Sequence, residues 1–152
     1  MRKLLISLAL AIPVFAVDHN LLQKGYEVYK KHCSACHIER ATPEQIKKFR
    51  MMAMRGEKLP IAAPPMNEVS ARVKKFYPGE LEFITFVKDY ITNPSREKGV
   101  CMPMAFKLFG VMPPIGKALS EEEKEAVAYW LYHNYKESWK EMMRKMHGKM
   151  MH

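Results

Sequence analysis

The sequence is poor in cysteine, which excludes several kinds of site. Only three of its 152 residues are cysteine, and two of them, Cys33 and Cys36, are three positions apart. A structural zinc site needs four ligands, often supplied by two such pairs, and no second pair is present. A redox dithiol is expected beside a βαβ pattern, which the sequence lacks. A plain disulfide between the two cysteines is the simplest interpretation that these absences leave open.

Long apolar runs are scarce as well. The longest, residues 4–17, contains Pro13 and is shorter than the roughly 20 residues that a membrane-spanning helix needs. Two basic residues precede the run, and small residues stand near its end, as in a secretory signal peptide cleaved after Ala16. We therefore expect residues 1–16 to be a signal peptide and the mature chain to be periplasmic or otherwise exported. A retained membrane anchor is the alternative.

Acidic residues are too few to balance the basic ones. Lysine and arginine number 25, against 16 aspartates and glutamates. Removal of the predicted signal peptide leaves 23 basic and 16 acidic residues, a net charge of +7. Basic chains often bind nucleic acid, but export argues against that partner. An acidic protein surface is the expected partner, and an anionic membrane surface is the alternative.

Strand patterns are hard to find, and apolar residues recur instead at three- and four-residue steps, which predicts an all-α fold. Thr42 with Gln45, and Ser120 with Glu123, have the spacing of a capping box at a helix start. The predicted helices cover residues 18–33, 42–55, 68–76 and 80–92, and a last helix begins at Ser120. Residues 59–65 and 95–119 are predicted to be loops, and loops as long as the second are usually functional.

The motif that carries chemistry is Cys33-Ser34-Ala35-Cys36-His37. Two thiols three positions apart on a helical turn can add to the two vinyl groups of one haem, and the histidine that follows then projects toward the iron. We therefore expect one haem c, bound covalently through Cys33 and Cys36, with His37 as the proximal ligand of the iron.

The chain resembles class I cytochrome c. Gly25-Tyr26-Glu27-Val28-Tyr29-Lys30-Lys31-His32-Cys33 is similar to the first helix of that family, and Val127-Ala128-Tyr129-Trp130-Leu131 is similar to its last helix. The resemblance covers roughly residues 20–135. It implies a cytochrome c fold in which the N- and C-terminal helices cross, with long loops around the haem. It also implies that Gly25 permits their close approach and that Tyr29 meets Trp130 and Leu131.

The iron needs a sixth ligand, and thioether ligation suits an electron carrier because it raises the potential of a haem. Met112 lies in a proline-rich loop that precedes the final helix by the short span seen in the family. We therefore expect Met112 to be the distal ligand. The alternatives are Met102, Met104 and Met66, and each methionine also has an ordinary interpretation as core filler.

The resemblance further implies that a proline-containing loop orients the proximal histidine through a backbone carbonyl. Pro64 is the candidate, with an ordinary turn as the alternative. Pro64 lies further from His37 than in short members of the family, so residues 40–60 are interpreted as an insertion. The expected organisation is a signal peptide at 1–16, a cytochrome c domain at 17–135 and a basic, Met-rich extension at 136–152.

Two features remain outside the family pattern. We expect Cys101 to be a buried neutral thiol, with a role in the distal loop or an intermolecular bridge as alternatives. The extension is expected to be a frayed helix, with an interfacial or docking helix as alternatives. Its sulfur and imidazole groups also form a potential Cu(I) cluster, which comprises Met142, Met143, Met146, His147, Met150, Met151 and His152.

The function that these features predict is one-electron transfer between redox proteins. A haem with both axial positions filled leaves no site for a substrate, so the chain is expected to be an electron carrier and not itself an enzyme, although it can be a subunit or partner of an oxidoreductase. Basic residues around the haem edge are expected to steer acidic partners. The alternatives are a haem enzyme or gas sensor with a labile distal methionine, and a copper-handling protein that uses the extension.

Overall fold

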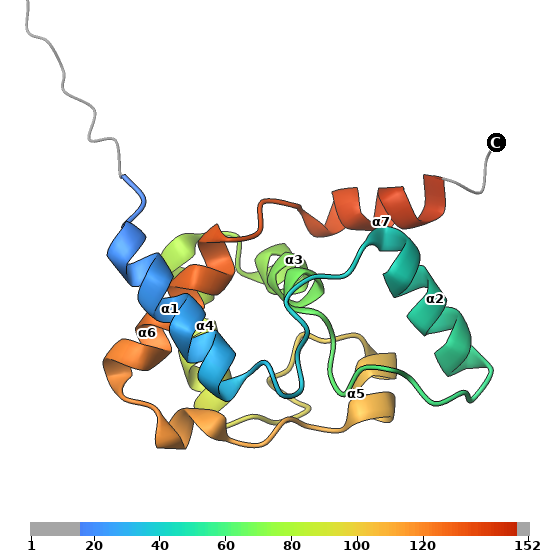
Figure 1. Cartoon of the computed structure of the whole chain (residues 1–152), viewed down its shortest axis with the longest axis horizontal. Helices are drawn as coiled ribbons and strands as arrows, with labels where there is room; N and C mark the ends of the chain where they lie inside the picture. The colour runs from blue at the N-terminus through green and yellow to red at the C-terminus, as the bar shows by residue number, and fades with distance from the viewer. Residues whose placement is uncertain (1–15, 149–152) are drawn as a thin grey trace, which may run out of the picture.

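The computed structural model describes residues 16–148 of the chain (Figure 1). Within this range the chain forms seven α-helices, one short 3₁₀ helix and no strand, which confirms the prediction of an all-α fold. The elements are α1 His19–His32, α2 Pro43–Met54, α3 Met66–Phe76, α4 Glu80–Thr92, α5 Pro103–Phe109, η1 Ile115–Ala118, α6 Glu121–His133 and α7 Trp139–His147. The predicted signal peptide lies outside the described residues, except for Ala16.

Side-chain caps fix where two of the predicted helices begin. The Thr42 hydroxyl accepts a hydrogen bond from the Gln45 amide at 3.2 Å, and the Gln45 side chain accepts one from the Thr42 amide at 2.8 Å. Ser120 and Glu123 form the same reciprocal pair at the start of α6. Both predicted capping boxes are confirmed, and a cap of this kind typically stabilises a helix by about 1 kcal/mol.

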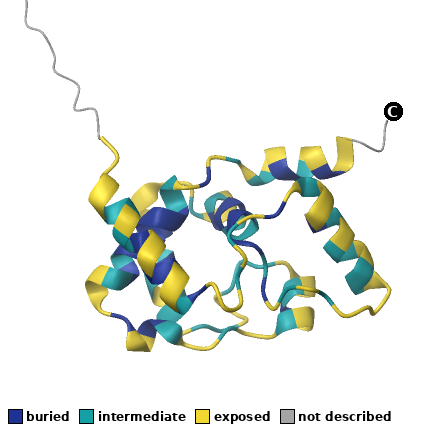
Figure 2. Cartoon of the chain, in the orientation of Figure 1, coloured by how far each residue is buried: buried dark blue, intermediate teal, exposed yellow. Residues whose placement is uncertain are grey.

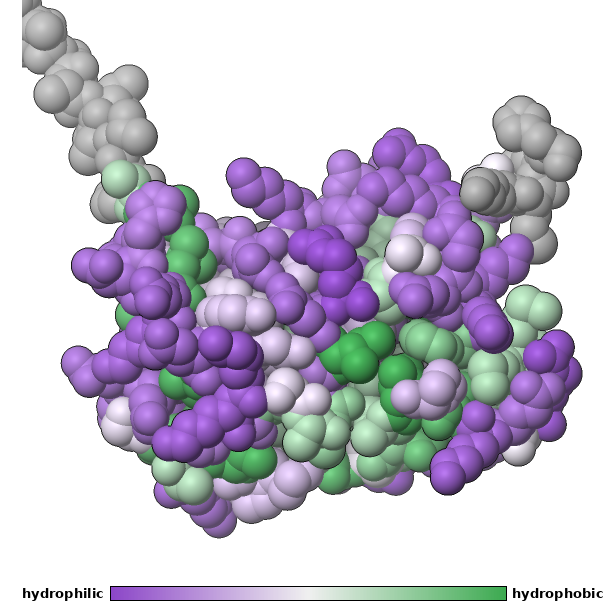
Figure 3. All heavy atoms as spheres, viewed as in Figure 1, coloured by the Kyte–Doolittle hydropathy of each residue, from purple (hydrophilic) through white to green (hydrophobic). Residues whose placement is uncertain are grey.

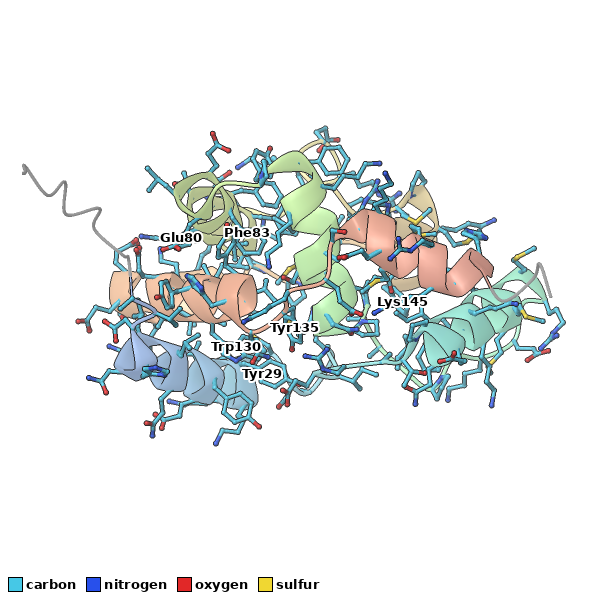
Figure 4. The ribbon with its side chains drawn as sticks, turned by 90° about the horizontal axis from the view of Figure 1, so that it is seen from above. Tyr29, Glu80, Phe83, Trp130, Tyr135 and Lys145 are labelled. Carbon is cyan, nitrogen blue, oxygen red and sulfur yellow. The ribbon has the colours of Figure 1, made fainter. Side chains whose placement is uncertain are left out.

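The crossing of α1 and α6 depends on Gly25. A Cβ atom on this glycine would lie 2.5 Å from Cβ of Trp130 and closer still to the carbonyl oxygen of Ala126. Because no side chain fits there, the two helices pack backbone against backbone. The rings of Tyr29 and Trp130 then stack with their centroids 4.8 Å apart (Figure 4). The predicted crossing, and the meeting of Tyr29 with Trp130, are confirmed.

The segment from residue 95 to residue 119 is more ordered than predicted. It contains α5 and η1, so the expectation of one continuous irregular stretch is wrong for these residues. Pro103 stands in the first turn of α5, and Gly110, with a φ of 73°, ends it. Both helices are too short to show a clear apolar period, which explains why the pattern missed them.

The helices divide between two ends of the molecule. The α1, α4 and α6 helices gather at one end and α2 and α7 at the other, with α3 between them (Figure 1). We call the apolar cluster at the first end the first core. Its buried members are Val28, Tyr29, Cys33, Met66, Val73, Phe83, Ile84, Val87, Leu119, Val127, Ala128, Tyr129, Trp130, Leu131 and Tyr135.

The second core is smaller and joins α2, α3 and α7. Its buried members are Ala41, Ile46, Ala71, Met142 and Met146, with Phe49, Trp139 and Met143 packed against them. The predicted insertion and the predicted extension therefore pack on each other. We call α2, α7 and this core the α2–α7 region.

The expectation of a frayed extension is wrong for residues 139–147. A capping box of Ser138 and Glu141 begins α7, and Met142 and Met146 are only 1% and 5% exposed. The apolar face of α7 is covered by α2 and α3 and is not presented to a lipid surface (Figure 2). No helix in residues 16–148 is both long enough and apolar enough to cross a membrane.

Candidate functional site

A cavity of about 280 Å³ brings together the residues predicted to bind the haem. Cys33, Cys36, His37 and Met112 all line it. The rest of the wall is mainly apolar and comes from α3, α4, α5, α6 and the loops between them, with Val69, Val73, Phe86, Val87, Ile91, Phe106 and Phe109 among the lining side chains. The structure thus places residues far apart in the sequence around one space.

A tight turn after α1 places both cysteines of the motif at this cavity. The amides of Cys36 and His37 both donate hydrogen bonds to the carbonyl oxygen of Cys33, at 3.1 and 2.9 Å. Cys33 is buried and Cys36 is exposed, and neither forms a disulfide. Burial raises the pKa of the Cys33 thiol to about 11, and the nearby Cys36 contributes in the same direction. Both sulfur atoms are therefore free for thioether bonds, and Cys33 is a neutral thiol.

His37 is oriented by the loop that contains Pro64. Its Nδ1 atom lies 2.7 Å from the carbonyl oxygen of Pro64. A carbonyl oxygen only accepts hydrogen bonds, so Nδ1 carries the proton and donates, and Nε2 keeps its lone pair. Burial lowers the pKa of His37, against the opposing effect of the Pro64 hydrogen bond, and so favours the neutral ring. The predicted role of Pro64 is confirmed.

The backbone around His37 is held from two further sides. The Tyr29 hydroxyl donates a hydrogen bond to the His37 carbonyl oxygen at 2.9 Å. The amide of Met66 donates to the Ile38 carbonyl oxygen at 2.9 Å. The aromatic pair in the α1–α6 crossing and the start of α3 therefore both fix the position of the histidine.

The four methionines considered as the sixth ligand are placed differently. Met112 and Met66 line the cavity, whereas Met102 and Met104 are exposed and do not. Met66 is bonded through its backbone beside His37 and Pro64, on the side of the histidine. Among these four methionines only Met112 lines the cavity from the loop between α5 and η1, in a different part of the chain from His37 and Pro64.

Three further residues, which the sequence motifs did not assign to the site, lie at the cavity or support its wall. Cys101 is half-buried, not buried as expected, and lines the cavity; burial raises the pKa of its thiol, which favours the expected neutral form. His32, which directly precedes Cys33, is also among the lining residues. Arg72 donates from Nε to the carbonyl oxygen of the lining residue Val100 at 2.8 Å. No sequence pattern predicts such a contact, because the two residues are 28 positions apart in the chain.

The donor set and the wall fit a haem c. Two free thiols, a neutral imidazole with an available Nε2 and one thioether converge on an apolar space that suits a flat macrocycle. The described residues contain no cluster of three or more histidine, cysteine, aspartate or glutamate side chains that would hold a bare metal ion. Every buried side-chain nitrogen or oxygen in this part of the chain has a hydrogen-bond partner. The cavity therefore favours an apolar cofactor over a polar ligand.

Comparison with known proteins gives the family. No solved structure matches the chain. The family model described as "Cytochrome C oxidase, cbb3-type, subunit III" matches residues 20–131, from the second residue of α1 to near the end of α6. The match includes the cysteine pair, His37, Met112 and the α1–α6 crossing, and it leaves α7 outside. The chain thus belongs to the cbb3-type cytochrome c oxidase subunit III family and is a class I c-type cytochrome, an electron-carrying haem protein.

Proposed function

We propose that this chain is an exported carrier of single electrons with one haem c, and that its electrons pass to or within an oxidase of the cbb3 type. The observation that carries the proposal is the convergence of Cys33, Cys36, His37 and Met112 on one apolar cavity. Bound there, haem c supplies a one-electron couple, while the protein sets its potential and exposure.

Each residue of the site has a separate task in this proposal. Cys33 and Cys36 form the two thioether bonds. His37 donates from Nδ1 to Pro64, which fixes the ring and leaves Nε2 as the proximal ligand. Met112 provides the distal ligand from a loop stiffened by Pro113 and Pro114. If His37 and Met112 both held the iron, no position would be left for a substrate, which favours a carrier over an enzyme or a gas sensor.

The sequence supports the exported location and the domain limits. A signal peptide at 1–16 delivers the chain to the periplasm, where covalent attachment to Cys33 and Cys36 gives the mature protein. The cytochrome c domain then spans residues 17–135, followed by the extension at 136–152. The net charge of +7 after cleavage supports redox partners with acidic docking surfaces, so electron transfer is expected to slow as salt rises.

Absorption spectra of the purified protein, together with a denaturing gel stained for haem, test this function. We expect haem to remain on the polypeptide and the ferric protein to show the red charge-transfer band of methionine ligation. Met112→Ala should abolish that band, and Met104→Ala, at an exposed position outside the cavity, should leave it unchanged. Persistence of the band in Met112→Ala would assign the ligand elsewhere. Rapid binding of carbon monoxide to the ferrous wild type would replace the carrier with an enzyme or sensor.

A further inference from the structure

Most of the excess positive charge of the mature chain lies in two short segments. Residues 40–60 contain six basic and two acidic residues, and residues 136–148 contain four basic and two acidic residues. The segments 17–39 and 61–135, which supply every residue that lines the haem cavity, together contain twelve of each. The excess of basic residues thus lies outside the segments that line the cavity, and steering of partners by basic residues at the haem edge stays a prediction. The charge lies in the α2–α7 region.

The two basic segments are distant in the sequence and adjacent in the structure. The second core holds α2 and α7 together through Ile46, Met142 and Met146. Between the two helices lies a groove of about 210 Å³. Its lining residues are Pro43, Glu44, Lys47, Lys48, Met51, Arg55, Lys145 and Met146. Four of these eight side chains are basic and one is acidic, so the groove combines positive charge with two methionines.

Within the described residues, two of the four basic side chains in the groove form ion pairs and two do not. Arg55 pairs with Glu57, and Lys145 pairs with Glu137, so these two side chains are held at the rim. In the view of Figure 4, Lys145 lies on the side of α7 that faces α2. Within residues 16–148, neither Lys47 nor Lys48 forms an ion pair. These two lysines repel each other, and among the described residues Glu44 is the one acidic side chain that lines the groove with them, so the groove keeps an excess of positive charge that further carboxylates would offset.

We propose that this groove binds an acidic, extended segment of a partner protein. Carboxylates of the segment would face Lys47 and Lys48, and its apolar side chains would contact Met51. A concave groove between two helices fits a chain segment better than a flat lipid surface. The large apolar side chains of α7 that would enter a membrane are turned inward, and hydrophilic residues cover its outer side (Figure 3).

The groove is separate from the haem cavity, because no residue lines both. An acidic segment held by α2 and α7 would therefore leave the cavity mouth uncovered. The partner would be tethered at one end of the molecule while the other end remains free to exchange electrons. This arrangement goes beyond the proposed carrier function, which requires only the haem end.

Binding of a fluorescent oligoglutamate peptide to the full-length, haem-loaded protein tests the proposal. Lys47→Gln/Lys48→Gln should weaken binding at low salt by about tenfold, as two surface charge pairs of the usual strength predict. The matched control is Lys107→Gln/Lys117→Gln, which removes the same charge from exposed positions on α5 and η1. It should change the affinity by less than about twofold.

Equal losses in the two double variants would show that the peptide senses only net charge, and this would overturn the groove as a site. No binding by the wild type would overturn it as well. Binding to vesicles of phosphatidylglycerol and phosphatidylcholine that depends on Lys47 and Lys48, without peptide binding, would assign the groove to a membrane instead. None of these results affects the proposed electron transfer, because the visible spectrum and the rate of reduction measure that function separately.

Discussion

The two ends of this molecule have different physical designs. The first core is built from stacked aromatic rings, a close helix crossing and an apolar cavity, and its surface charges balance. The α2–α7 region has a small core that includes two buried methionines, and the segments that form and flank it, 40–60 and 136–148, carry six of the seven excess positive charges. A cofactor needs a rigid, apolar enclosure, whereas a docking surface needs accessible charge. The family match includes the first end and stops before α7.

The largest expected effect comes from the crossing at the first end. Gly25→Ala would place a Cβ atom against Trp130 and the backbone of Ala126. Since backbone cannot move aside cheaply, we expect a loss of about 3 kcal/mol in the free energy of unfolding. Denaturant unfolding of the haem-loaded protein measures it. Gly79→Ala is the matched control, because its nearest neighbour is the movable side chain of Glu82 at 3.4 Å. Equal stability of the two variants would contradict the close approach.

The second core should be able to unfold while the first core stays folded. Met142→Ala removes a side chain that is 1% exposed and should cost about 2 to 3 kcal/mol. We expect α7 to detach and the visible haem spectrum to stay unchanged. Faster amide hydrogen exchange confined to α2 and α7 would report the detachment. Met54→Ala, at a residue that is 79% exposed, is the control. A parallel loss of the haem spectrum would mean that the two ends form one cooperative unit.

Arg72 contacts both ends of the molecule. Its guanidinium lies 4.8 Å from the ring centroid of Trp139 in α7 and 4.9 Å from that of Phe76, and it donates to Val100 at the cavity wall. We expect Arg72→Lys to cost about 1 kcal/mol through the lost hydrogen bond and stacking. It should also alter the red charge-transfer band of the haem-loaded protein. Lys75→Ala, on the same helix, should leave the band unchanged. An unaltered band in Arg72→Lys would restrict Arg72 to a structural role.

The smallest expected effect on stability comes from removing lysine charges at the two ends. At the first end, Lys88 bridges α4 and α6 through Glu125 at 2.8 Å, and its hydrogen bond to Glu125 raises the pKa of the lysine. Lys88→Gln should therefore lower stability by about 0.5 kcal/mol, and salt should reduce the difference. Lys47→Gln/Lys48→Gln should cause no loss, since neither lysine forms an ion pair within residues 16–148. Thermal unfolding at low and high salt measures both, and a larger loss in the second variant would show that its lysines are structural.

Local signals in the sequence predicted most of the helices. The capping boxes at Thr42 and Ser120, and the apolar period of residues 80–92, depend only on neighbours within a few positions, so they can be read without the fold. The α5 and η1 helices were missed because four to seven residues are too few to define a period. The α7 helix was underestimated because its methionines are buried by helices from far earlier in the chain.

The sequence alone determined the chemistry of this protein. Two thiols and a histidine at fixed spacing predict a covalent haem from the sequence alone, because the spacing needs only a local turn to bring the three side chains together. The glycine and aromatic residues of the first and last helices likewise identified the crossing. Only the tertiary structure brought Pro64 to His37 and placed Met112, rather than Met102 or Met104, at the cavity. The tertiary structure also brought the two basic segments together to form one groove. Local helix preference does not decide which distant helices meet; α2 and α7 meet because each buries its apolar face against the other.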